Sequence, residues 1–235
     1  MARIAESTDR LLASAATLTD AGMREPSLLP GWSRGHVLTH IARNADGLGN
    51  LLRWARTGTR TPMYASAQAR ADDIEAGAGR PAAGLAGDVR ASAAAFAAEA
   101  ASMPGDAWTV QVQALAGHPF PALTVLSRRL SEVEIHHVDL AAGYRPGDWP
   151  AGFVAEALPR VARSFAGRAD APACLVRADG SPDSFRIGQD EPDVPPVVVH
   201  GPPADLLAWL LGRDDGSGLQ VPGGLATPPA LPAWR

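Results

Sequence analysis

The chain has 235 residues, enough for one large domain or two modest ones, and its hydrophobic content of 46% is typical of a globular protein with a buried core. The formal net charge of −4 argues against a nucleic-acid partner. No apolar run approaches the roughly 18 residues of a membrane span, and charges among the first 20 residues indicate an amphipathic helix and not a signal peptide. A single cysteine, Cys174, excludes an internal disulfide, so we expect a cytoplasmic protein.

The first 143 residues are predicted to form a helical bundle. A first helix is expected over residues 4–22, where Gly22 is placed to end it. Ser33 is a suitable N-cap for a long helix from Arg34 to Thr57, whose apolar residues recur at helical spacing. The other predicted elements are helices at 66–76, 85–102 and 123–142, and an extended stretch at 108–113.

The composition changes after Gly143, and the proline-rich segment 144–150 predicts a domain boundary. Beyond it, a helix at 152–167 is followed by three β-like runs and a short apolar helix at 205–211. The runs are 173–177, 184–187 and 194–200. We therefore predict a mainly α protein, with a four-helix bundle over residues 1–146 followed by a small α+β domain over residues 151–235.

Glu132 and His136 stand out within the helix at 123–142. Residues four apart lie on the same face of a helix, so one carboxylate oxygen and one imidazole nitrogen can reach a single point. On the long helix, His40 lies at the edge of the apolar stripe and is the better placed of two histidines to face inwards. Two histidines and one carboxylate leave one tetrahedral position of a zinc ion open, which is typical of catalytic sites.

Spacing alone leaves other interpretations open. A glutamate four residues before a histidine is common on solvated helices, where the pair stabilises the helix by about 0.2–0.5 kcal/mol. His137 projects into the apolar stripe and is expected to be a buried, hydrogen-bonded histidine, whereas Glu134 is expected to point away from the core. Cys174 has no neighbouring base in the sequence and is interpreted as a small core residue.

Several separated stretches carry a family resemblance over nearly the whole chain. They are Leu29–Asp46, with Pro-Gly-Trp-Ser and His-Val-Leu-Thr-His; Pro62–Tyr64; Asp73–Ala78; Glu132–Leu140; Asp205–Arg213; and Leu231–Trp234. In these motifs the sequence resembles the mycothiol-dependent maleylpyruvate isomerase family, a branch of the DinB-like metal-binding bundles.

The resemblance implies a fold, a site and a reaction. It places zinc on His40, Glu132 and His136 in a DinB-like bundle, and it places Arg213 near the active site as a catalytic residue. The implied cofactors are Zn²⁺ and mycothiol, and the implied substrate is a small acidic or electrophilic molecule. A zinc-bound thiolate would add to the cis double bond of maleylpyruvate, permit rotation and leave, giving fumarylpyruvate. We expect a monomer or a small homo-oligomer, with neither nucleic acid nor membrane as a partner.

Three alternatives share the same ligands or lack a metal. A mycothiol S-transferase would use the same thiolate but keep the new carbon–sulfur bond, in detoxification or natural-product biosynthesis. A non-enzymatic zinc-binding bundle would bind metal without thiol-dependent turnover. A domain that has lost its metal would do neither. The ligands cannot separate the isomerase from the transferase, because the two differ in the pocket that receives the electrophile.

Overall fold

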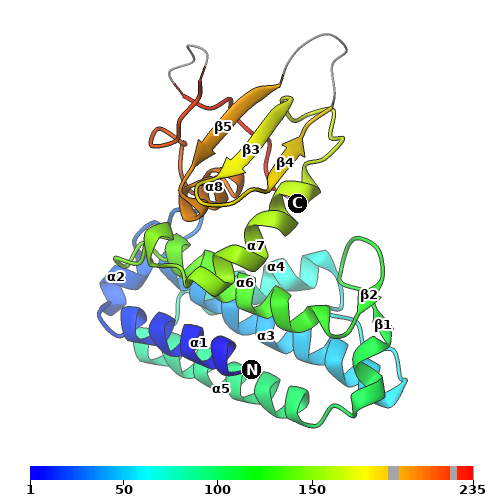
Figure 1. Cartoon of the computed structure of the whole chain (residues 1–235). Helices are drawn as coiled ribbons and strands as arrows, with labels where there is room; N and C mark the ends of the chain where they lie inside the picture. Colours follow the sequence, from blue (N-terminus) through cyan, green and yellow to red (C-terminus); the bar gives the residue numbers. More distant parts are fainter. Residues whose placement is uncertain (190–195, 223–226, 235) are drawn as a thin grey trace. The chain divides into compact units, whose positions relative to one another are not determined.

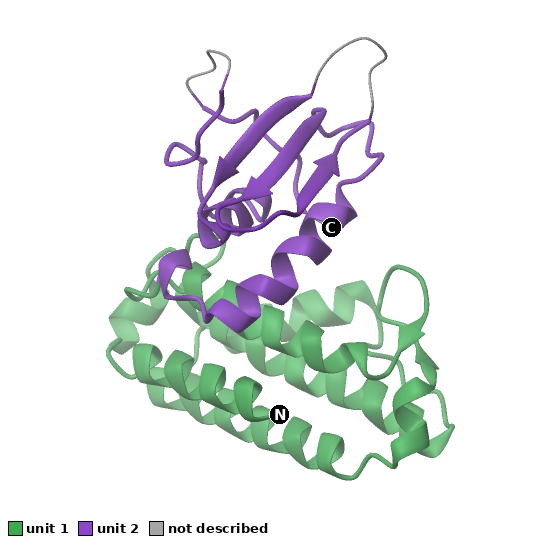
Figure 2. Cartoon of the chain, in the orientation of Figure 1, with its two compact units in different colours: residues 1–144 green, residues 145–235 purple. Residues whose placement is uncertain are grey.

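The computed structural model describes residues 1–189, 196–222 and 227–234. The chain divides into two compact units, Met1–Tyr144 and Arg145–Arg235 (Figure 2). The first unit is helical and the second combines helices with a small sheet, so the predicted fold class, mainly α with a small α+β part at the C-terminal end, is confirmed. Among the described residues, no helix combines the length and the apolar character needed to cross a bilayer.

The first unit is a bundle built around one central helix (Figure 1). Helix α3 packs against α4, α5 and α6, and α1 packs against α5 and α6. Its helices are α1 Ala2–Ala15, α2 Asp20–Arg24, α3 Arg34–Thr57, α4 Ala67–Ala78, α5 Ala82–Ala101 and α6 Thr124–Asp139; a 3₁₀ turn, Gly105–Thr109, precedes the strand pair β1 Gln111–Val112 and β2 Phe120–Pro121.

Helix α3 begins and ends where the sequence predicts. The hydroxyl of Ser33 accepts a hydrogen bond from the backbone N–H of His36, and the His36 ring accepts one from the Ser33 N–H, so each residue satisfies a donor of the other. At the other end Gly58 adopts a left-handed conformation with φ of 72°, which closes the helix without a Cβ clash. The apolar stripe of α3, which includes Leu38 and Ile41, is fully buried in the bundle core.

Two predicted elements differ from the structure. The helix predicted over 4–22 is two helices, because the hydroxyl of Thr19 accepts from the Gly22 N–H and starts α2 anew. Gly22 therefore lies inside the second helix. The extended stretch predicted at 108–113 is a strand only at Gln111–Val112, since the preceding residues close a 3₁₀ turn.

Glu134 is a third correction, because its side chain is buried and not turned away from the core. Its carboxylate accepts hydrogen bonds from Ser7 and, at 2.7 Å, from Arg10, both on α1, and at 2.6 Å from the hydroxyl of Tyr144. A buried carboxylate is tolerated when it is paired and hydrogen-bonded in this way. Glu134 thus ties α1 to α6, and this contact between distant segments is not visible in the helical pattern.

Helices α3 and α4 approach closely through glycine. A Cβ on Gly35 would lie 2.1 Å from the carbonyl oxygen of Ala78 at the end of α4. We expect Gly35→Ala to lower the free energy of unfolding by about 1–3 kcal/mol, because the backbone must shift to admit the methyl group. On the same helix, Gly49 has no atom within 4 Å of such a Cβ. Gly49→Ala should instead raise stability by about 0.5–1 kcal/mol through helix propensity, and urea unfolding of both variants tests the contrast.

The second unit contains two helices and a three-stranded sheet. Helix α7 Ala151–Ser164 packs against α8 Pro203–Leu210, and the strands are β3 Cys174–Ala178, β4 Ser184–Ile187 and β5 Val197–Gly201. The strand order is β4-β3-β5, with β3 antiparallel to β4 and parallel to β5.

The strand predicted at 194–200 begins at residue 197 in the structure, and residues 194 and 195 lie outside the described part of the chain. Cys174 is buried in the sheet, and burial raises the pKa of its thiol to about 11.

Candidate metal centre

The structure brings together His40, Glu132 and His136 from two helices of the first unit. His40 comes from the middle of α3, and Glu132 and His136 come from successive turns of α6. The side chain of His40 is 6% exposed, that of His136 16% and that of Glu132 32%. The cluster is therefore buried on the α3 side and reachable from the carboxylate side, as a site that receives a ligand must be.

The donor atoms of this triad are spaced as metal ligands are. The Nε2 atom of His40 lies 3.0 Å from Oε2 of Glu132 and 3.1 Å from Nε2 of His136, and the third side of the triangle is 3.5 Å. Atoms held about 2.0–2.2 Å from a tetrahedral zinc ion lie about 3.3–3.6 Å apart, so a small expansion of the triangle admits the ion. The chemistry of the donor set, two imidazoles and one carboxylate, fits zinc in the same way.

The protonation states of the triad also favour an ion. Burial by itself raises the pKa of Glu132, but hydrogen bonds with His136 and His40 outweigh it and hold that pKa well below the usual range. Burial likewise lowers the pKa of His136, but hydrogen bonds to Asp139 and Glu132 raise it to about 9. Burial and the charge of His136 lower the pKa of His40 to about 4. At neutral pH the metal-free triad therefore holds one carboxylate, one imidazolium and one neutral imidazole.

Two like groups face each other in this metal-free state. Nδ1 of His40 lies 3.1 Å from Nη2 of Arg70, a guanidinium that can only donate, so the proton of neutral His40 is on Nε2. The Nε2 atom of protonated His136 also carries a proton. The two Nε2 atoms lie 3.1 Å apart. A cation bound by both would displace the proton of His136 Nε2 and would leave the proton of neutral His40 on Nδ1.

Residues outside the triad contact its two histidines, and these contacts differ between His136 and His40. Asp139, which is fully buried, lies 2.8 Å from Nδ1 of His136, as in the carboxylate–histidine pairs that orient metal ligands. The ring of Trp32 covers an edge of His40, with the ring centroids 5.5 Å apart. The contact from Arg70 to His40 does not fit a ligand, because metal on Nε2 puts the remaining proton on Nδ1. Arg70 would have to leave this position for His40 to bind a metal through Nε2.

Arg70 also lines a polar cavity of about 220 Å³ beside the triad. Tyr64 stands in its wall with a buried hydroxyl, and the guanidinium carbon of Arg70 lies 5.8 Å from the centroid of its ring. Charged side chains of both signs are also part of the lining: Arg43, Asp46 and Asp73.

The sequence analysis did not identify Arg70, Tyr64 or Asp139 as residues of the site. The spacing of Asp139, three residues after His136, was a local signal for one of them, whereas the other two come from the segment around α4.

The structure gives the contacts of two other predicted residues within their own units. His137 is buried as expected, with Nε2 2.8 Å from the hydroxyl of Ser14 and its ring stacked on Tyr144. Arg213 follows α8 in the second unit, where it is half-buried and its Nη1 donates to the Leu211 carbonyl at 2.6 Å. Its catalytic role stays a prediction.

Comparison with known proteins now adds to this geometry. Residues 4–141 match the mycothiol maleylpyruvate isomerase N-terminal domain, and residues 148–230 match the MDMPI C-terminal domain. The chain belongs to the mycothiol-dependent maleylpyruvate isomerase family. The predicted resemblance is confirmed, and this member of the isomerase family is an enzyme.

Solved structures of the isomerase family support the assignment over the full length. A crystal structure of the mycothiol-dependent maleylpyruvate isomerase has a TM-score of 0.90 and 29% sequence identity, and the match covers 99% of this chain and 95% of that chain. A histidine-to-alanine mutant of the mycothiol-dependent maleylpyruvate isomerase gives a TM-score of 0.89 with the same identity and coverage. A search of the curated proteins gives no significant match.

Asp139 offers a test that leaves the three candidate ligands in place. Asp139→Asn removes the charge that holds the proton of His136 on Nδ1 while keeping the size of the side chain. We expect zinc affinity, corrected for proton competition at His136, to fall by about 10–100-fold, the usual effect of losing an outer partner of a ligand. Competition with a chromophoric chelator measures it. Asp148→Asn, on the exposed 3₁₀ turn of the second unit, is the matched control and should leave the affinity unchanged.

Proposed function

We propose that the chain is a zinc- and mycothiol-dependent isomerase that converts maleylpyruvate to fumarylpyruvate, with the ion on His40, Glu132 and His136. The observation that carries the proposal is the convergence of these three donors, 3.0–3.5 Å apart, in a chain whose two halves both match the isomerase family. The neighbours in structure are described as mycothiol-dependent maleylpyruvate isomerases, which supports this substrate and this thiol.

The residues of the chain supply binding, orientation and charge. When bound, the zinc ion and mycothiol together supply nucleophilic sulfur that can add to an activated double bond and leave again after rotation. Glu132 would neutralise one positive charge of the ion, and Asp139 would fix the ring of His136 for ligation. The ring of Trp32 packs against the ring of His40 in a T-shaped arrangement. Arg70, once displaced from Nδ1 of His40, is a cation in the wall of the polar cavity and is available to pair with a substrate carboxylate.

The assay that tests the proposal follows both the substrate and the thiol. The zinc-loaded protein is mixed with mycothiol and an excess of maleylpyruvate. Because an isomerase returns its thiol after each turnover, we expect many equivalents of fumarylpyruvate while the titre of free thiol stays constant. Omission of mycothiol should stop the reaction.

Other results would point to other functions. Loss of one thiol for each product, or turnover only with a different electrophile, would overturn the isomerase and identify an S-transferase. Tight zinc without turnover of either kind would contradict the enzymatic proposal. Full activity without mycothiol would contradict the role of the thiol.

A further inference from the structure

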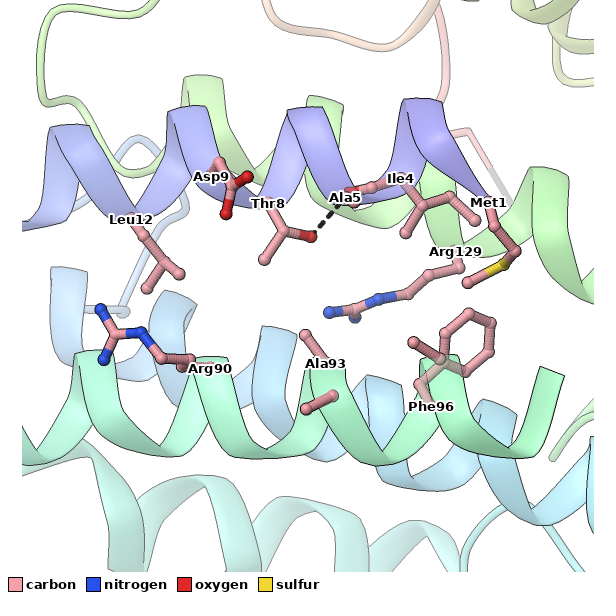
Figure 3. Close-up of a pocket in the computed structure, with 12 residues that line it drawn as sticks. Met1, Ile4, Ala5, Thr8, Asp9, Leu12, Arg90, Ala93, Phe96 and Arg129 are labelled. Atoms are coloured by element: carbon pink, nitrogen blue, oxygen red, sulfur yellow. Dashed lines mark hydrogen bonds between the residues drawn. The ribbon is translucent and has the colours of Figure 1, made fainter. Parts of the chain in front are cut away.

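A second cavity lies in the first unit, between α1 and α5. Its volume is about 260 Å³, just below the common range of about 300–1,000 Å³ for small-molecule sites. The side chains around it are mostly apolar, and Figure 3 shows how α1 and α5 supply opposite walls. They include Ile4, Ala5, Leu12, Ala93, Phe96 and Ala97. Exposed Asp9 and Arg90 lie at the edge of the cavity, so its mouth is polar.

One buried cation belongs to this apolar cavity. Arg129 extends from α6 into the space between α1 and α5, and its guanidinium lies between Thr8 and Ala93 (Figure 3). The whole residue is 0% exposed. Burial lowers the pKa of its guanidinium to about 10, so the group still carries its charge at neutral pH. An arginine in such a place needs partners for its charge and its N–H groups.

The guanidinium is only partly satisfied. Its Nη1 atom donates to the Ile41 carbonyl at 2.8 Å and to Oδ1 of Asn44 at 2.9 Å. The Nε and Nη2 atoms are buried and have no hydrogen-bond partner among the described residues. These two atoms form one edge of the guanidinium, the edge that pairs with both oxygens of a carboxylate. Unmet buried donors are rare in native proteins and call for a ligand or an ordered water.

We propose that the cavity between α1 and α5 binds a small molecule with an apolar body and one carboxylate, which pairs with Nε and Nη2 of Arg129. The apolar body would lie along Ile4, Ala93 and Phe96. Because Nε and Nη2 are closed off from solvent, binding needs a small rotation of the side chains around them. This site is separate from the triad in its residues and does not depend on the proposed reaction.

Calorimetric titration of the full-length, zinc-loaded protein with octanoate and with 1-octanol tests the site. The two probes share the apolar chain and differ in the charge. Octanoate should bind at one site and at least about tenfold more tightly than octanol, because only the carboxylate can use the charged edge. Equal affinity, or no saturable binding of octanoate, would overturn the proposal.

Variants locate the bound octanoate. Ala93→Leu fills part of the cavity and should abolish binding, whereas Ala98→Leu makes the same change on an exposed position of α5 and should not. Arg129→Met should reduce octanoate binding to the level of octanol. If this variant fails to fold, the comparison of Ala93→Leu with Ala98→Leu still decides. His40→Ala, which removes a zinc ligand, should retain octanoate binding. Binding that is lost in His40→Ala but kept in Ala93→Leu would assign the carboxylate to the metal and reject the cavity.

Discussion

His40→Ala and His136→Ala are each expected to remove zinc from the purified protein and to abolish thiol-dependent turnover. Each change leaves two ligands, and a site with two protein ligands cannot orient an open position for a thiol. Loss of an outer partner alone weakens zinc binding by about 10–100-fold, so loss of a ligand should weaken it by more than about 100-fold. Metal analysis by mass spectrometry and the isomerase assay give the two readouts.

The comparison needs a histidine that is not a ligand. His118→Ala changes an exposed loop residue and should keep one zinc ion per chain and full activity. Thermal unfolding of the three variants shows whether the fold survives, because a collapse of the bundle would also release metal. Zinc at one ion per chain in a folded His40→Ala or His136→Ala protein would reject the triad as the metal centre.

Local spacing predicts those parts of the site that lie within one helix. Glu132 and His136 follow from the four-residue period of α6, and Ser33 marks the start of α3. His40 could be proposed as the third donor because it lies at the inner edge of an apolar stripe. The sequence alone could not place it 3.1 Å from His136, because 96 residues separate the two and only the packing of α3 on α6 brings them together.

What the sequence could not predict depends on contacts between distant segments. Glu134 has the spacing of a solvated residue, yet its carboxylate is buried and Arg10 on α1 gives it a charged partner. Arg129 has the charge of a surface residue, yet α1 and α5 enclose it. The break between α1 and α2 depends on whether Thr19 caps a new helix, a local choice that the apolar pattern does not report. In each case a charged or polar residue has a role that its own helix does not reveal.

Zinc affinity is expected to rise about tenfold for each pH unit between roughly pH 5 and pH 8, because the ion must displace one proton. In that interval the metal-free triad holds a single exchangeable proton, on His136, whose pKa is raised to about 9. His40, with its pKa lowered to about 4, and Glu132 are already deprotonated. The sign follows directly: lowering the pH leaves His136 protonated and favours the metal-free state, so affinity should fall about 100-fold from pH 8 to pH 6.

Calorimetric zinc titration at pH 7 in buffers of different ionisation enthalpy counts the released protons, and we expect a value near one. Asp139→Asn provides the matched variant, because Asp139 supplies the largest contribution that raises the pKa of His136. In this variant the pKa falls, so zinc affinity should stop rising at a lower pH than in the wild type. Release of two protons at pH 7 would show that His40 is also charged in the metal-free protein. A pH-independent affinity would show that the ion does not bind through His136 at all.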